Sequence, residues 1–125
     1  MRRFLVLGVL AVGLGAFGFV MGQEKADSGL PVYLVAQIRI DDRETYRKYE
    51  VGFGEIFQKY EGESVGFTEN PDIIEGEWPY SRTVLLRFPS KDAFHSWYDS
   101  DEYQELVKNR WASSEANIIV MRGRR

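Results

Sequence analysis

The first clear pattern in the chain is an alternation of apolar and polar positions that begins after Pro31 and runs to Ile40. A period of two residues is typical of a β-strand with one buried face. Asp41 and Asp42 then offer a helix N-cap, and apolar residues at spacings of three and four as far as Tyr60 predict a long amphipathic helix. One face of the strand carries Val32, Leu34, Ala36, Ile38 and Ile40, and the other carries Tyr33, Val35, Gln37 and Arg39.

The middle of the chain has a weaker pattern. Val65 and Phe67 alternate with polar residues, and a break at 70–71 is followed by a short apolar pair at 73–74. We interpret this region as a strand, a break and a short extension that leads into the next strand as a hairpin. That next strand, over 82–88, is expected to alternate Val84, Leu86 and Phe88 on its buried face with Arg82, Leu85 and Arg87.

Pro89 ends this strand, and Ser90 is a suitable N-cap for a second helical region from about 91 to 113. The pair at 99–100 is expected to break this region and to cap its second half. A last strand is predicted over 118–121. The order is β-α-β-β-α-β, which predicts an α+β, ferredoxin-like fold: a four-stranded antiparallel sheet with two helices on one face.

The run RTVLLRFPSKDAFHSWYDSDEYQ, over residues 82–104, carries an FPS…A…WYDS…EYQ pattern. It resembles the uncharacterised family known as domain of unknown function 1330, which belongs to the dimeric α/β-barrel superfamily. The resemblance covers about residues 31–122. It implies the fold and a homodimer and is silent on activity. Because related barrels include cofactor-independent monooxygenases and isomerases, an enzyme of that kind is an alternative to a binding module.

The predicted sheet has a second face that two helices on one side leave uncovered. Tyr33, Val35 and Leu85 lie on it by alternation, with Val65 and Phe67 as expected neighbours. Each large apolar side chain left in water forgoes about 1.5–3 kcal/mol. The pattern therefore predicts a homodimer through this face.

The charge and the residue composition exclude several classes of function. The net charge is −3, which argues against a nucleic-acid partner because nucleic-acid binding rests on a basic surface. There is no cysteine, so disulfides and thiolate chemistry are excluded. The sequence contains no glycine-rich phosphate loop, nucleophile elbow or zinc-helix motif. We expect no metal and no cofactor.

The N-terminus predicts the location of the protein. Arg2 and Arg3 precede an apolar run without charge that ends at Gly22, which is the layout of a secretory signal peptide or of an uncleaved membrane anchor. Both alternatives place the body outside the cytoplasm, in the periplasm or secreted, or anchored on the outer side of the membrane. The expected organisation is a signal peptide or anchor (1–22), a linker (23–30), the α/β-barrel domain (31–122) and a basic tail (123–125).

Polar side chains on the uncovered face are the candidate binding residues. The set consists of Tyr33, Gln37, Arg39, Thr83 and Arg87. Guanidinium groups pair well with carboxylates, so a chamber between two sheets could hold a small anionic or carbonyl-bearing molecule. The alternative is that the arginines pair with Glu63, Glu75 or Glu77 and only complete the interface.

A histidine, an arginine and a set of aromatic residues are further candidates for a functional role. His95 is the only histidine, and a histidine is the usual axial ligand in related haem-binding barrels, but its helical position turns it outward. Arg110 resembles a position that is often arginine in the family, and it could cap carbonyls of its own helix. An aromatic set could line a substrate mouth, although aromatic residues at helical spacing more often form core. This set consists of Trp97, Tyr98, Tyr103 and Trp111.

Overall fold

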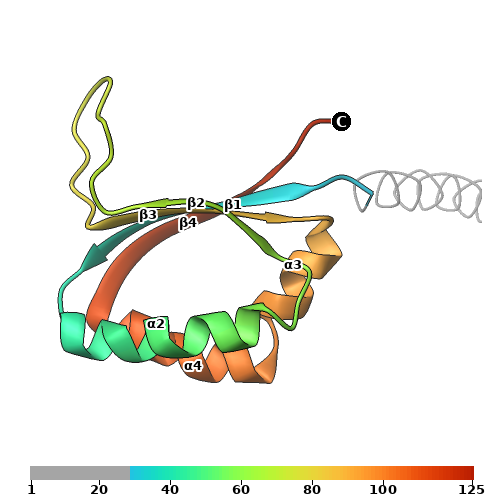
Figure 1. Cartoon of the computed structure of the whole chain (residues 1–125), viewed down its shortest axis with the longest axis horizontal. Coiled ribbons are helices and arrows are strands. Elements are labelled where there is room, and N and C mark those ends of the chain that lie inside the picture. Colours follow the sequence, from blue (N-terminus) through green and yellow to red (C-terminus); the bar gives the residue numbers. More distant parts are fainter. Residues whose placement is uncertain (1–28) are drawn as a thin grey trace, which may run out of the picture.

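The computed structural model describes residues 29–125 (Figure 1). The signal peptide or anchor predicted over 1–22, and most of the linker predicted over 23–30, lie outside the described residues. The elements are β1 (Val32–Ile40), α2 (Arg43–Phe57), β2 (Glu63–Thr68), β3 (Arg82–Phe88), α3 (Lys91–Tyr98), α4 (Asp101–Ser113) and β4 (Ser114–Arg122). The strands form one antiparallel sheet in the order β2-β3-β1-β4.

Within residues 29–125, helices α2, α3 and α4 lie on one side of this sheet, and no helix covers the other side (Figure 1). We refer to the two sides as the inner face and the outer face. The predicted α+β, ferredoxin-like fold is therefore confirmed. The long second helical region is divided into α3 and α4 where the sequence predicts a break.

Side-chain caps fix the starts of the helices. The Asp42 carboxylate accepts hydrogen bonds from the backbone N–H groups at the start of α2, at 3.1 and 3.3 Å. The Ser90 hydroxyl accepts from the backbone N–H of Ala93 at 3.0 Å, and the Ser100 hydroxyl accepts from that of Tyr103 at 3.2 Å. These caps satisfy N–H groups that have no partner inside a helix. The residues that predicted each helix start therefore also stabilise it.

The core lies between the inner face and the helices. Its aromatic centre is Phe88 and Trp97, which stack with 5.5 Å between ring centroids. α2 packs closely on α4 at Gly52, where a β-carbon would come within 2.5 Å of the Leu106 side chain. The buried strand residues are Val32, Leu34, Ala36, Ile38, Leu86 and Phe88, as the alternation predicts.

The prediction for Phe67 was wrong. The pairing of β2 with β3 shifts register between Ser64 and Gly66, so Phe67 lies opposite Val84 on the inner face. A β-bulge inserts one residue, and one extra residue turns all later side chains of the strand to the other face. Val65 is the residue passed over by this shift.

Arg82 was also assigned to the wrong face. It lies two residues before Val84 and four before Leu86, so alternation places it on the inner face with them. The structure agrees, because its guanidinium lies over the rings of Tyr46 and Phe67, at 5.1 and 5.0 Å from the centroids.

Two segments differ in length from the prediction. The extension at 73–74 forms no strand and belongs to a loop over 69–81. β4 starts at Ser114, directly after α4, and is therefore longer than the predicted 118–121. At this junction the Ser113 carbonyl accepts hydrogen bonds from the backbone N–H groups of Asp41 and Asp42, at 2.8 and 3.0 Å.

Within residues 29–125, none of the helices has the length and apolar character needed to cross a membrane. The same part of the chain contains no group of three or more histidine, aspartate or glutamate side chains arranged to hold a metal ion.

Candidate functional site

A cavity of about 370 Å³ lies between the inner face and the helices. This volume is in the range of small-molecule sites. Strands β1, β3 and β4 supply an apolar side that includes Ala36, Val84 and Ile118. The helical side is largely aromatic and contains Tyr46, Tyr49, Phe53, Trp97, Tyr98 and Tyr103. The surface of the cavity therefore suits a flat apolar molecule.

Arg110 brings a positive charge into this wall. It lies in the last turn of α4, and the whole residue is only 4% exposed. Its guanidinium carbon lies 5.7 Å from the centroid of the Tyr49 ring. Within residues 29–125 no carboxylate forms an ion pair with it, and its Nε has no hydrogen-bond partner, whereas another part of the guanidinium interacts with the Tyr103 hydroxyl. Burial of an unpaired charge is costly, so this arginine does not stabilise the fold through an ion pair.

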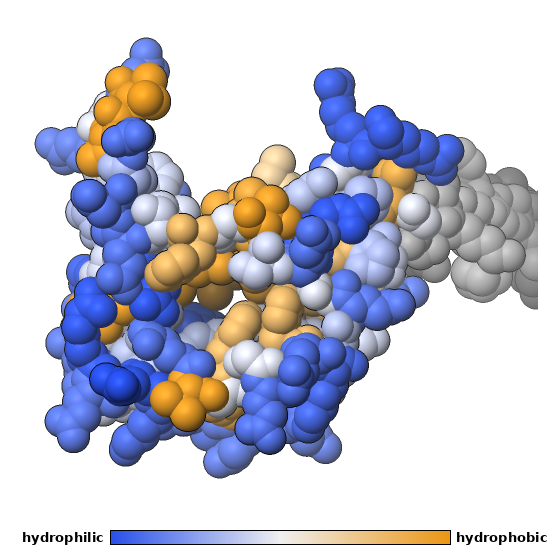
Figure 2. All heavy atoms as spheres, viewed as in Figure 1, coloured by the Kyte–Doolittle hydropathy of each residue, from blue (hydrophilic) through white to orange (hydrophobic). Residues whose placement is uncertain are grey.

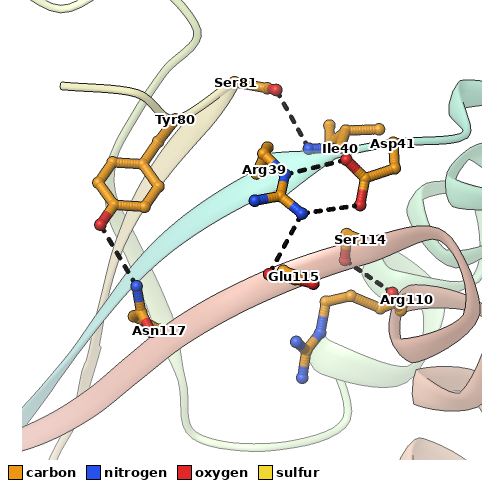
Figure 3. Close-up of polar contacts among 9 residues, drawn as sticks. All are labelled: Arg39, Ile40, Asp41, Tyr80, Ser81, Arg110, Ser114, Glu115 and Asn117. Atoms are coloured by element: carbon orange, nitrogen blue, oxygen red, sulfur yellow. Dashed lines mark hydrogen bonds and ion pairs between the residues drawn. The ribbon is translucent and has the colours of Figure 1, made fainter.

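The expectation that Arg110 caps carbonyls of its own helix is not what the structure shows. Instead, its own backbone carbonyl accepts hydrogen bonds from the hydroxyls of Ser113 and Ser114, at 3.5 and 2.6 Å (Figure 3). Helical spacing offered the signal that places it in the cavity, because Tyr103, Val107 and Arg110 follow one another at four and three residues and are all buried.

Arg82 is the second cation at the cavity, and it is neutralised. Its guanidinium lies 2.9 Å from the Glu50 carboxylate and 2.6 Å from that of Glu69. Burial lowers the pKa of Arg82, but the contact with Glu69 and the charges nearby raise it more, so the net shift is upward. Hydrogen bonding and charge from Arg82 lower the pKa of Glu69. This cluster closes one part of the cavity wall with paired charges.

Three buried N–H groups lack a hydrogen-bond partner among the described residues. They are the Nε groups of Arg82 and Arg110 and the indole Nε1 of Trp97. All three residues line the same cavity. Buried donors are nearly always paired in folded proteins, and exceptions need an explanation. Donors without acceptors around one cavity could bind the acceptor oxygens of a small molecule.

The phenols in the cavity remain protonated at neutral pH. The hydroxyls of Tyr49 and Tyr103 are hydrogen-bonded at 2.7 Å. Burial raises the pKa of both groups, and that of Tyr49 by the larger amount. Burial also raises the pKa of Tyr46. These groups can therefore donate or accept hydrogen bonds, but they are poor sources of phenolate.

The binding residues predicted from the sequence lie together on the outer face. Cross-strand pairing places Tyr33 opposite Arg87 and Gln37 opposite Thr83. The Thr83 hydroxyl accepts a hydrogen bond from the Trp78 indole at 2.9 Å. The set is adjacent as predicted, and Arg39 lines a second pocket together with Tyr80 and Asn117. Whether it binds a ligand stays a prediction.

The arginines of this set have acidic neighbours. Arg39 pairs with Asp41 at 3.0 Å and with Glu115 at 3.2 Å (Figure 3). Arg87 lies 4.0 Å from Glu63, one of the partners that the sequence suggested. These ion pairs are exposed, so each adds little to stability. They do reduce the positive charge that the outer face could offer to an anion.

His95 is on the surface, as its helical position predicts. Its side chain is about half exposed, and its Nδ1 lies 2.9 Å from the Asp99 carboxylate. The predicted aromatic set is divided. Trp97, Tyr98 and Tyr103 line the cavity, whereas Trp111 is exposed. The histidine thus lies outside the site and most of the aromatic set lies within it.

Comparison with known proteins gives one family and several similar folds. Residues 31–124 match the profile of DUF1330, a domain of unknown function. The curated proteins contain no match to the chain.

Solved structures share the fold at low sequence identity. The RPA0582 protein of unknown function from Rhodopseudomonas palustris is 22% identical, with a TM-score of 0.68 over 85% of this chain and 92% of that one. A dimeric ferredoxin-like protein of unknown function from Thermobifida fusca is 12% identical, with a TM-score of 0.58 over 76% and 92%. SnoaB, a cofactor-independent oxygenase from Streptomyces nogalater, is 15% identical, with a TM-score of 0.55 over 77% and 95%. At these identities the likeness concerns the fold alone.

Proposed function

Because the chain belongs to the DUF1330 family, whose description leaves its activity open, we propose from the chain's own cavity that it is a homodimeric module that binds a small aromatic carboxylate. The observation that carries this proposal is the trio of buried, unpartnered N–H donors around one aromatic cavity. The family resemblance stated from the sequence is confirmed, and it supplies no ligand.

The chemistry of the wall favours this class of ligand over others. A carboxylate offers acceptors to the Arg110 guanidinium and to the indole of Trp97. Aromatic rings of the ligand can pack edge-to-face against side chains such as Tyr49 and Phe53. A larger polyanion does not suit the site, because Arg82 is already held by two carboxylates.

Calorimetric titration with matched probes tests the ligand class. We would compare benzoate and 1-naphthoate with benzamide and 1-naphthamide, which keep the ring and lose the charge. We expect the carboxylates to bind at least about tenfold more tightly, because a hydrogen bond to a charged group contributes about 1.5–3 kcal/mol. Equal affinity for acid and amide would refute a role for charge in the site.

Replacement of Arg110 by methionine locates the site. Arg110→Met should abolish carboxylate binding, and it should leave the thermal midpoint unchanged or raise it, because an apolar side chain replaces a buried unpaired charge. Arg39→Met is the matched control on the outer face. If Arg39→Met removes binding and Arg110→Met does not, the ligand lies between the sheets, where the sequence analysis placed it.

The homodimer is supported by the composition of the outer face and by the dimeric neighbour from Thermobifida fusca. Cross-strand pairing places Val35 between Leu85 and Ile119, and Tyr33 opposite Met121, so these apolar side chains share the face. Ile119 is 59% exposed and Met121 is 53% exposed. Burial of such side chains by a second copy would recover about 1.5–3 kcal/mol each. Sedimentation should give twice the monomer mass at micromolar concentration.

An enzyme is the rival function, by analogy with the cofactor-independent oxygenase among the structural neighbours. One observation favours it: the Glu50 carboxylate and the hydrogen-bonded phenols of Tyr49 and Tyr103 line the same cavity. Mass spectrometry of a probe recovered after incubation separates the two functions. A binding module returns the probe unchanged, and an enzyme returns a product.

We also propose that the domain acts outside the cytoplasm. This rests on the charge and apolar pattern of residues 1–22. A reporter that works only after export, fused behind Arg125, should be active, and the same fusion without residues 1–22 should be inactive. A mature N-terminus near Gln23 would indicate cleavage, and an intact Met1 in the membrane fraction would indicate an anchor.

A further inference from the structure

The loop over residues 69–81, between β2 and β3, extends away from the sheet on the side opposite the helices (Figure 1). Its tip is apolar in the space-filling view (Figure 2). Ile73 is 53% exposed and Ile74 is 88% exposed. Two adjacent isoleucines with this exposure leave much of their apolar surface in water within one copy. Their position on the outer-face side points to a partner on that side.

This loop is also strongly acidic. It contains Glu69, Asp72, Glu75 and Glu77 and no basic residue. Glu69 pairs with Arg82 and Arg43. Within residues 29–125, Asp72, Glu75 and Glu77 form no ion pair. Three uncompensated negative charges therefore accompany the apolar tip.

The C-terminal tail has the opposite charge and lies at the opposite end of the sheet. Arg82, the first residue after the loop, is paired with Ile38, whereas Arg122, the last residue before the tail, is paired with Val32. The tail extends to the same side as the loop (Figures 1 and 2). It carries Arg124 and Arg125.

We propose that the loop over 69–81 is a clasp that docks on the C-terminal end of a second copy of this chain. The inference rests on the proposed homodimer and specifies its geometry. A two-fold axis that brings two outer faces together must lie parallel to the sheets. One such axis places loop against loop and tail against tail, and the perpendicular one places each loop over the partner's tail. Like charges oppose the first arrangement and unlike charges favour the second.

The end of the sheet near the tail also offers an apolar surface for the loop tip. Tyr33 and Met121 are paired there on the outer face. The tail is held beside them, because the Gly123 N–H donates to the Pro31 carbonyl at 2.7 Å. In the second arrangement the two isoleucines of each loop meet this surface while the acids of the loop meet Arg124 and Arg125. The clasp also closes the ends of the space that contains the predicted outer-face residues.

Charge reversal tests the clasp. The protein is expressed from its complete sequence and purified in whichever form cells produce, cleaved or anchored. Glu75→Lys with Glu77→Lys should raise the dimer dissociation constant about tenfold or more, because each pair occurs twice in a symmetric dimer. Arg124→Glu with Arg125→Glu should do the same. The combination of all four substitutions should restore affinity to within about threefold of the original. Tighter association of the loop variant alone would indicate loop-to-loop packing and overturn the proposal.

Cysteine cross-linking gives a second, independent readout, and the chain has no native cysteine to interfere. The double variant Glu75→Cys with Arg124→Cys should form covalent dimers on oxidation or with a short bis-maleimide. Neither single variant should form covalent dimers. Cross-linking of Glu75→Cys alone overturns the clasp in favour of loop-to-loop packing. A sedimenting dimer that none of the variants cross-links overturns the clasp and leaves the homodimer intact, whereas a monomer overturns both.

Discussion

The two faces of the sheet are built from the same strands and differ in what covers them. On the inner face, alternate residues of β1 are buried by helices, and an aromatic core surrounds a cavity. On the outer face, the residues between them remain partly exposed, and the charged ones are mostly paired with each other. The buried guanidinium of Arg110 therefore has no carboxylate partner within residues 29–125, whereas the exposed Arg39 and Arg87 on the outer face both have one. This contrast underlies our two proposals, that the inner cavity binds a ligand and that the outer face contacts a second copy of the chain.

The comparison predicts that substitutions on the inner face lower the stability of the monomer and that substitutions on the outer face weaken the dimer. Phe88→Ala, at a fully buried inner-face position, should lower the free energy of unfolding by about 3–5 kcal/mol. Met121→Ala on the outer face should leave unfolding of the dilute monomer nearly unchanged. Denaturant titration at low protein concentration measures both. Equal losses would mean that the outer face is as much a part of the monomer core as the inner one.

A charge placed at the centre of the outer face should act on assembly instead. Val35→Glu should raise the dimer dissociation constant by at least about a hundredfold, because it buries a carboxylate without a partner. Val51→Glu makes the same chemical change on α2 at a position that is 75% exposed, and it should have no effect. Sedimentation velocity distinguishes the two variants. A dimeric Val35→Glu protein would remove the outer face from the interface.

A subtler change on the inner face concerns its buried phenols. Tyr49→Phe removes the hydrogen bond between the Tyr49 and Tyr103 hydroxyls and should cost about 1–3 kcal/mol. Because burial raises the folded-state pKa of both tyrosines, their contribution to stability is complete below the unfolded value of about 10 and declines as pH rises above it.

Unfolding measured on both sides of that value should show this decline, with a smaller decline in Tyr49→Phe. A stability that increases above the unfolded value would contradict the assigned protonation state.

The smallest effect is expected at a residue that belongs to neither face. His95 pairs with Asp99 on the exposed side of α3. His95→Gln should change the free energy of unfolding by less than about 0.5 kcal/mol and leave probe binding unchanged. Phe94→Gln, one residue earlier and buried, is the contrasting control. A loss of binding in His95→Gln would mean that His95 acts as a metal ligand or a general base, although its exposed position argues against both roles.

The sequence predicted the elements well because each depends on neighbours along the chain. The alternation in β1 and the capping serines at 90 and 100 are local features with local causes. Phe67 was misplaced because the bulge before Gly66 depends on how β2 pairs with β3, and apolar alternation is the same with or without it.

The site was harder to predict because its residues meet only in three dimensions. The inner-face position of Arg82 could have been predicted from its spacing to Val84, but a charged residue is not expected on a buried face. Arg110 faces Tyr49, which belongs to another helix. Its lack of a carboxylate partner is a property of the packed molecule, and it has no signature within α4.

The Ser113 carbonyl, which joins the end of α4 to the turn between β1 and α2, has a consequence for local opening of the fold. Two amide protons, from Asp41 and Asp42, depend on this single acceptor, and Ser113 itself is almost completely buried. Fraying of the last turn of α4 would release both amides and the start of α2 at once. Segments far apart in the chain thus form one cooperative unit at this end of the molecule, and their amides should exchange with solvent at matching rates.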